Sequence, residues 1–289
     1  MIKFDEINYS NFGRCLHITN GSIELVVTLD FGPRVICASF VGKDNFMWED
    51  TAREYSNDVN GKKFYNYGGH RLWISPETFP DTYYPDNDPV SYEVKGDTVT
   101  FTQPQQTTGF ALKIDITMSA DENRVDLRHY VTNNTGVERK VAPWAITMLA
   151  NGGHEIIPVN DNDTGYLANR YVVLWPYAKM NDPRINWGDK YMVLDQTNEQ
   201  AAEMTSPFKI GISQIHPWAV YLKNNQIFMK RYTFYPDAEY PDGNCSFETY
   251  SCKSFIEMET VGTYRTMANG ETAVHDETWC FFDNVDFKA

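Results

Sequence analysis

The sequence predicts an all-β protein built as one large antiparallel β-sandwich. Along many short segments, apolar and polar residues alternate with the two-residue period of half-buried strands. Turn residues separate these segments, and no segment keeps a helical period beyond about three turns. So many strands would curl or split as a single layer, which favours two stacked sheets. No linker or repeat divides the chain, so residues 1–289 are expected to form a single domain.

The individual strands follow from the same pattern. Residues 23–29 alternate as a half-buried strand, and a short apolar strand follows the Gly-Pro pair at 32–33. Three hairpins are expected next, each with polar or glycine residues at its turn. They cover residues 91–103, 110–134 and 218–234, with turns at 96–97, 121–123 and 224–225. Strands at 254–262 and 272–282 close the chain in the same style.

Composition limits the classes of function. The net charge is −14, with 39 acidic against 25 basic residues, which argues against nucleic acid or an anionic membrane as partner. No apolar run approaches the roughly 18 residues of a membrane span, and the first twenty residues lack the apolar core of a secretory signal. A cytoplasmic protein, monomeric or a small homo-oligomer, is therefore expected. Its five cysteines form no paired motif and are interpreted as reduced thiols.

The stretch "NYGGHRLWISPETFPDTYYPDN", residues 66–87, carries the first candidate site. Its glycine pair at 68–69 indicates a close approach by backbone or ligand. Arg71 offers a planar fork of donors for sugar hydroxyls, and Trp73 offers a ring for stacking. In a strand these two side chains share one face, while His70 lies on the other. The alternatives are a core role for Trp73 and a structural ion pair between Arg71 and Glu77.

The stretch "FIEMET" carries the second candidate site. Glu257 and Glu259 are two residues apart, so both carboxylates point to one face of the expected strand. Mutual repulsion and partial burial raise the pKa of such a pair, which suits proton transfer near neutral pH. The alternative is an edge strand whose charged face simply meets solvent.

The remaining candidates carry weaker signals. His129 shares a face with apolar residues and is interpreted as a core histidine, whereas His154 is expected at the surface. His216 shows no partner in the sequence. Lys230 is either a site residue or an exposed strand lysine. Residues 160–165 resemble the start of a calcium loop but lack its final glutamate, and no phosphate loop or zinc motif is present, so neither metal nor cofactor is predicted.

Four blocks together resemble the galactose-mutarotase-like sugar-binding superfamily, which includes the aldose 1-epimerases. They are Gly68–Glu77, which matches a branch with the motif G-G-H-R-L-W-x-x-P-E, and the stretches "VAPWAITMLANGG", "IFMKRY" and "FIEMETVGTYRTMANGETAVHDETW". The resemblance implies a β-supersandwich, a carbohydrate ligand and a catalytic glutamate matched by Glu257 or Glu259. Glu259 is preferred, because the turn after it matches the branch.

The resemblance implies an aldose 1-epimerase-like protein that acts on a hexose or hexose derivative, with His70 as the acid. The residues implied to bind the sugar are Arg71, Trp73, Glu77, Trp144 and Lys230. Two departures stand against this activity. Tyr67 replaces the histidine of a His-Gly-Gly motif, and "VAPWAITML" lacks the second histidine of epimerases. The alternatives are a non-catalytic carbohydrate-binding protein on the same fold, and a lyase or hydrolase of the superfamily.

Overall fold

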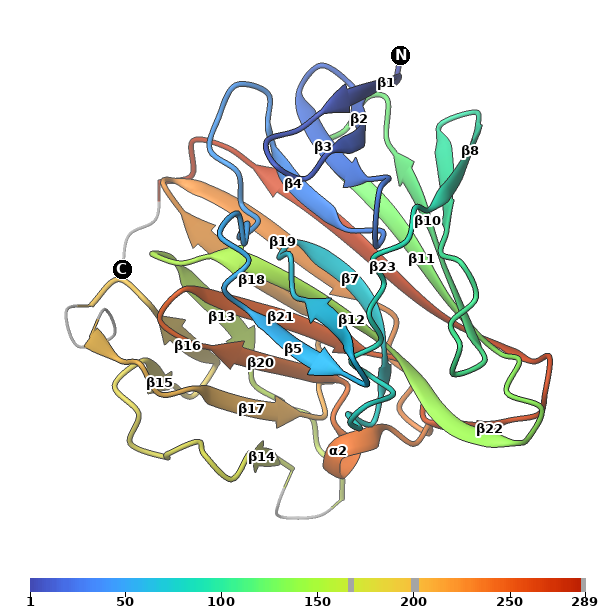
Figure 1. The fold of residues 1–289 in the computed structure, drawn as a ribbon. Helices are drawn as coiled ribbons and strands as arrows, with labels where there is room; N and C mark the ends of the chain where they lie inside the picture. Colours follow the sequence, from blue (N-terminus) through green and yellow to red (C-terminus); the bar gives the residue numbers. More distant parts are fainter. Residues whose placement is uncertain (166–168, 199–202, 287–289) are drawn as a thin grey trace.

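The computed structural model describes residues 1–165, 169–198 and 203–286, and two large antiparallel sheets dominate it (Figure 1). In this part of the chain the first sheet has eleven strands. Their spatial order is β1 (Lys3–Asn8), β2 (Arg14–Thr19), β3 (Ile23–Thr28), β4 (Val35–Phe40), β7 (His70–Ser75), β12 (Arg139–Ala150), β21 (Phe255–Val261), β20 (Phe247–Ser251), β17 (Phe208–Ile212) and β14 (Val172–Leu174), with β22 (Arg265–Met267) paired to β12.

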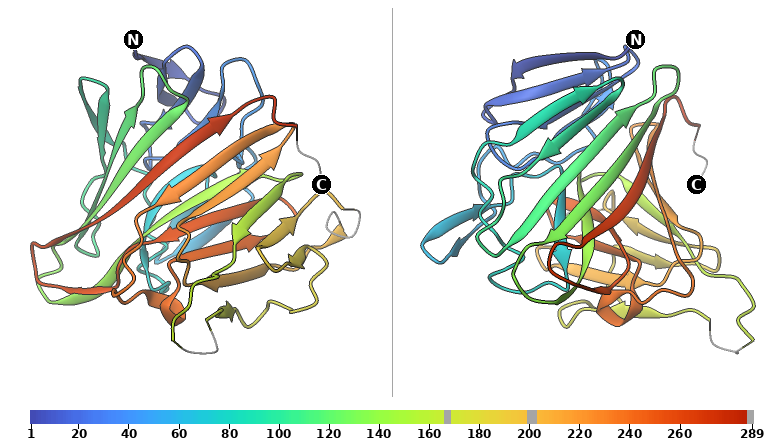
Figure 2. Two further views of the ribbon diagram at one scale, coloured as in Figure 1. Left: turned by 180° about the vertical axis from the view of Figure 1, so that it is seen from behind. Right: turned by 90° about the vertical axis from the view of Figure 1, so that its right-hand side faces the viewer.

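The second sheet has ten strands within the described ranges and packs against the first (Figure 2). Their spatial order is β15 (Ile185–Trp187), β16 (Tyr191–Asp195), β13 (His154–Pro158), β18 (Trp218–Lys223), β19 (Gln226–Tyr232), β23 (Thr272–Phe282), β11 (Arg124–Asn133), β10 (Phe110–Met118), β9 (Thr98–Thr102) and β8 (Ser91–Lys95). A separate hairpin pairs β5 (Ser56–Val59) with β6 (Lys62–Tyr65), and α2 (Pro241–Asn244) is a single turn. The all-β fold class is confirmed.

The core lies between the two sheets, and period-2 patterning builds it. Every second residue of β10 is buried, from Phe110 to Met118, while the residues between them are partly exposed. β11 and β23 show the same alternation. The expected turns are also present, because Gly96, Asn224 and Asn225 have positive φ and close the β8–β9 and β18–β19 hairpins.

The middle of the first sheet is buried on both faces. All seven residues of β21 are buried, and the strand lies between β12 and β20. The interpretation of this segment as a solvent-facing edge strand is therefore wrong. Its outer face is covered by the β5–β6 hairpin and neighbouring loops: the Phe64 ring lies 5.6 Å from the Trp73 ring, and Tyr55 lies 5.2 Å from Phe255. Figure 1 shows β5 in front of these strands.

Two smaller expectations concern cysteines and membranes. All five cysteines are free thiols, as expected from their spacing. Within the described residues, no helix has the length and apolar character that crossing a bilayer requires.

Candidate functional site

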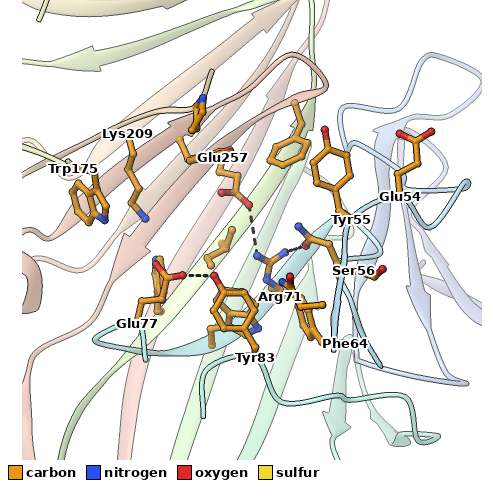
Figure 3. A pocket seen from close by; sticks show the side chains of 18 of the residues that line it. Glu54, Tyr55, Ser56, Phe64, Arg71, Glu77, Tyr83, Trp175, Lys209 and Glu257 are labelled. Carbon is orange, nitrogen blue, oxygen red and sulfur yellow. Dashed lines mark hydrogen bonds and ion pairs between the residues drawn. The ribbon is translucent and has the colours of Figure 1, made fainter. Parts of the chain in front are cut away.

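A pocket of about 510 Å³ opens on the outer face of the first sheet. Strands β7, β12, β17, β20 and β21 form its floor, and loops around residues 54–57, 77–83 and 175–177 form its walls (Figure 3). Aromatic side chains dominate the lining: Tyr55, Phe64, Trp73, Tyr83, Trp144, Trp175, Tyr177, Tyr250 and Phe255. Such a lining with a few convergent polar groups is typical of small-molecule sites.

Strand register explains why these floor residues meet. Arg71 lies opposite Ile146, and Trp73 lies opposite Trp144, across the β7–β12 ladder. On the next ladder Ile146 lies opposite Glu259. Residues directly opposite one another point to the same face of a sheet, so three strands contribute one continuous surface.

Arg71 and Glu257 face each other across the middle of the floor. The Arg71 Nη2 atom lies 3.6 Å from Glu257 Oε1, which is an ion pair without the short distance of a hydrogen bond. Arg71 also donates to Asn66 Oδ1, and its guanidinium carbon lies 4.1 Å from the centre of the Trp73 ring. The Nε atom of Arg71 is buried without a hydrogen-bond partner. The fork therefore retains donor capacity beside the pocket.

Glu257 is the carboxyl group best suited to exchange a proton with a ligand. Burial raises its pKa to about 8, and repulsion from Glu259 adds to this shift, while Arg71 and Lys209 oppose it. Among the described residues no side chain or backbone amide donates a hydrogen bond to it within normal distance, and it lines the pocket. A carboxyl group with a pKa near the working pH can both give and take a proton.

Lys209 in the pocket floor forms a second charged group with the buried Glu248 and Glu259. The Lys209 ammonium lies 2.8 Å from Glu248 Oε2 and 2.9 Å from Glu259 Oε2. It also lies 4.6 Å from the ring centre of Trp144 and 4.7 Å from that of Trp175. Burial raises the pKa of Glu248 to about 8, with Lys209 opposing the shift. We call Arg71, Lys209, Glu248, Glu257 and Glu259 the pocket-floor cluster.

The expected base Glu259 does not line the pocket. Its side chain is fully buried, and Oε2 accepts hydrogen bonds from Trp144 Nε1 at 2.8 Å and from Lys209 Nζ. Its neighbour Glu257 lines the pocket instead. The preference for Glu259 over Glu257 as the base is therefore corrected in favour of Glu257, because a base must reach the proton that it removes.

Glu77 lies on the pocket wall, where it accepts a hydrogen bond from the Tyr83 hydroxyl. The alternative of an Arg71–Glu77 ion pair is not found, because Arg71 pairs with Glu257. Burial and the hydrogen bond to Glu77 raise the pKa of Tyr83. The pocket therefore holds a second carboxylate with a hydroxyl beside it.

His70 points away from the pocket, and its expected place in the cleft is corrected. The alternation along β7 sends its ring between the sheets, where it is fully buried. Nδ1 is hydrogen-bonded to Thr147 Oγ1 at 2.9 Å and Nε2 to His129 Nε2 at 2.8 Å. Burial holds the pKa of His70 well below its usual range, so the ring is neutral. It cannot reach a ligand in the pocket from this side of the sheet.

Lys230 also lies between the sheets, so neither a sugar contact nor an exposed lysine is found. Its ammonium donates to Ala145 O at 2.9 Å and to Met258 O at 3.0 Å, and it lies 2.8 Å from Glu277 Oε1. These three partners use all three protons of the ammonium group. The lysine compensates a buried carboxylate and holds two strands of the pocket floor from behind.

We call His70, His129, His275, Lys230 and Glu277 the inter-sheet cluster. Ligating atoms of His70, His129 and Glu277 lie within 4.8 Å of one another, which is close enough for a metal ion. However, Lys230 already compensates the Glu277 carboxylate, and Trp279 Nε1 donates to its other oxygen at 3.0 Å. The cluster therefore has the chemistry of a satisfied hydrogen-bond network.

The glycine pair serves backbone packing. Gly68 and Gly69 both have positive φ, and a Cβ atom would stand 2.1 Å from Trp48 O at the first and 2.3 Å from Val35 O at the second. Of the two possibilities that the glycine pair left open, what approaches this turn is neighbouring backbone.

The other histidines are accounted for locally. His129 is fully buried, and its Nδ1 bonds to His275 O at 3.0 Å, as expected for a core histidine. His154 is partly exposed beside Asp195, and His216 has a partner that the sequence did not suggest, Asp161 at 2.7 Å.

Sequence reasoning missed several residues of the site, among them the pocket-lining Lys209, Tyr83 and Trp175 and the buried Glu248 that pairs with Lys209. Lys209 carried a signal, because it is a charge inside the otherwise apolar strand β17, whereas Glu248 lies in β20 among Thr249 and Ser251 and carried none. Tyr83 and Trp175 lie in loops, where no period predicts the direction of a side chain.

Comparison with known proteins identifies the fold. No family model matches the chain, and no curated protein matches it by sequence. Among solved structures, a TPR-domain containing protein from Parabacteroides distasonis has a TM-score of 0.62 at 12% identity, covering 96% of this chain and 49% of that one. This chain thus spans about half the length of that protein.

Two further structures match along their whole length. A galactose mutarotase-like protein from Lactobacillus casei has a TM-score of 0.57 at 11% identity, covering 93% of this chain and 100% of that one. The galactose 1-epimerase from Lactobacillus acidophilus has a TM-score of 0.51 at 9% identity, with 98% of each chain covered. The chain has the galactose mutarotase-like β-sandwich fold, and the resemblance seen in the sequence is confirmed at the level of fold.

Proposed function

We propose that the pocket binds a carbohydrate and that Glu257 transfers protons in an aldose 1-epimerase-like interconversion of anomers. The observation that carries the proposal is a carboxyl group with a pKa of about 8 in the floor of an aromatic-lined pocket. Aromatic faces suit the apolar faces of sugar rings. The fold supports the proposal as an analogy only, because one fold hosts many functions.

The chemistry needs two groups. Ring opening requires one group to take the proton of the anomeric hydroxyl and another to protonate the ring oxygen. At neutral pH the Glu257 carboxyl is largely protonated and gives its proton to the ring oxygen. Glu77, with the Tyr83 hydroxyl beside it, takes the anomeric proton. Recyclization on the other face of the carbonyl reverses both transfers and restores both groups.

A non-catalytic carbohydrate-binding protein is the second candidate. The observation favouring it is that no histidine lines the pocket within the described residues, since His70 belongs to the inter-sheet cluster. In that case the same aromatic side chains and Arg71 hold the sugar without proton transfer.

Polarimetry of freshly dissolved glucose, galactose and uronic acids, with isothermal titration calorimetry, tests both candidates. Wild type is expected to accelerate anomer exchange of at least one sugar, and Glu257→Gln to slow it about 10²–10⁴-fold with affinity largely kept. Glu93→Gln, on the exposed strand β8, is the matched control. Binding without acceleration supports the second candidate, and absence of both overturns the carbohydrate proposal.

A further inference from the structure

Seven of the nine aromatic residues that line the pocket form two separate groups, one on each side of the Arg71–Glu257 pair. The first group, Phe64, Trp73, Tyr83 and Trp144, is joined by ring contacts of 5.1–5.6 Å. The second group, Tyr55, Tyr250 and Phe255, is joined by contacts of 5.2 and 5.8 Å. Among the described residues no ring contact links the two groups. Figure 3 shows Tyr83 and Phe64 below the Arg71 guanidinium and Tyr55 above it.

The volume of the pocket also favours a ligand with two rings. A volume of about 510 Å³ lies within the roughly 300–1,000 Å³ of pockets that bury drug-sized ligands. A single hexose is much smaller than such a ligand, whereas two linked rings are of that size. One hexose would leave one of the two aromatic groups facing water.

Charge limits the kind of sugar. Glu54, Glu77 and Glu257 line the pocket, and Arg71 and Lys209 are the cations among the described lining residues. Lys209 is paired with Glu259 at 2.9 Å, whereas the largely protonated Glu257 beside Arg71 does not cancel the charge of the guanidinium. The wall carboxylates Glu54 and Glu77 form no ion pair with a cation among the described residues, so a uronic acid would bring a third carboxylate beside these two. Neutral sugars avoid this repulsion.

We propose that the preferred ligand is a neutral oligosaccharide of at least two rings, which spans the Arg71–Glu257 pair with one ring on each aromatic group. The inference rests on the proposed carbohydrate function of the same pocket. The Arg71 fork then lies beside the linkage between the rings, where its loosely paired Nη2 can donate to hydroxyls of either ring.

Calorimetry with matched ligands tests the span. Maltose, cellobiose and lactose are compared with glucose and galactose, and digalacturonate represents acidic chains. At least one neutral disaccharide is expected to bind ten times more tightly than either monosaccharide, and digalacturonate at least ten times more weakly than that disaccharide. This wild-type comparison requires no variant to fold.

Variants then test whether the second sugar ring binds at the aromatic group that contains Tyr55. Tyr55→Ala is expected to reduce disaccharide affinity about tenfold or more, as truncation of an aromatic anchor does. The ratio of disaccharide affinity to monosaccharide affinity should fall with it. Tyr55→Phe, which keeps the ring and loses the hydroxyl contacts with Ser254 Oγ and Cys252 Sγ, is the matched control and should keep most of the ratio of disaccharide to monosaccharide affinity. Tyr83→Ala should weaken both ligand classes alike.

The outcomes separate this inference from the function on which it rests. Equal affinity for monosaccharides and all disaccharides overturns the two-ring ligand while leaving carbohydrate binding intact. Tight binding of digalacturonate overturns the neutral class. Absence of binding by any sugar overturns both proposals together.

Discussion

The pocket-floor cluster and the inter-sheet cluster lie on opposite faces of the same central strands, yet they differ in how completely their polar groups are paired. In the inter-sheet cluster, Lys230 has three acceptors and both Glu277 oxygens accept hydrogen bonds. In the pocket-floor cluster, Arg71 Nε and Glu259 Oε1 are buried without hydrogen-bond partners. Satisfied networks rigidify a core, whereas buried groups without hydrogen-bond partners leave a site that is less completely paired.

The pKa values follow this difference in pairing. Burial alone raises the pKa of Glu277, but the charge of Lys230 and the nearby histidine rings outweigh it and hold the pKa below its ordinary value. The pKa of Glu257 rises to about 8, because burial and repulsion from Glu259 outweigh the attraction of the Arg71 charge. Arg71 lies 3.6 Å from Glu257, whereas Lys230 lies 2.8 Å from Glu277. One cluster therefore stabilises a fixed charge, and the other keeps a proton available.

The largest expected effect comes from breaking the inter-sheet pair. Lys230→Met leaves the Glu277 carboxylate buried without its cation, and removal of one partner of such a pair costs about 3–5 kcal/mol. Urea unfolding of the variant and wild type measures this difference. The double variant Lys230→Met with Glu277→Gln should recover part of the loss. A cost below about 1 kcal/mol for Lys230→Met would contradict the role assigned to the pair.

The corresponding change in the pocket floor should affect stability far less. Glu257→Gln has the shape of the protonated acid that prevails at neutral pH, and its ion pair with Arg71 is long at 3.6 Å. We expect the free energy of unfolding at pH 7 to stay within about 1 kcal/mol of wild type, while Glu277→Gln loses several times more because it strands the Lys230 ammonium. Equal losses in the two variants would remove the distinction between the clusters.

The smallest effect is a difference in the pH dependence of stability. The pKa of Glu257 is raised, so the folded protein holds an extra proton between about pH 4.5 and 8, and stability falls as pH rises through that window. The slope is at most about 1.4 kcal/mol per pH unit for each proton. Glu257→Gln should flatten this slope in urea unfolding measured from pH 5 to 8.

The inter-sheet histidines give the opposite sign. Burial lowers the pKa of His275 to about 3, and it also lowers those of His70 and His129. Below about pH 6.5 the unfolded chain binds protons that the folded protein refuses, so stability falls as pH decreases. Below about pH 4.5 Glu257 is protonated in both the folded and the unfolded protein, so Glu257→Gln should leave that part of the acid limb unchanged, which makes it the internal control for the flattened slope.

Much of the fold was predictable because burial on one face leaves a period of two in the sequence. The hairpins at 91–103 and 110–134 were located from that period together with their turn residues. The same rule placed Arg71 and Trp73 on one face and His70 on the other, and all three lie as that rule requires. Local sequence thus determines which residues share a face of a strand.

Only the tertiary structure decided which face of each strand meets the pocket and which meets the second sheet. Lys230 and Glu257 are both charged residues on period-2 strands, yet one lies between the sheets and the other lines the pocket. The choice depends on strand order, which brings β7, β12 and β21 together although long stretches of chain separate them. It depends also on loops such as 77–83, whose side chains follow no period. The alternation of apolar and polar residues shows that one face of a strand is buried, but not whether the second sheet or a loop covers it. The sequence therefore determined the strands, and the packing of the two sheets and the loops decided the site.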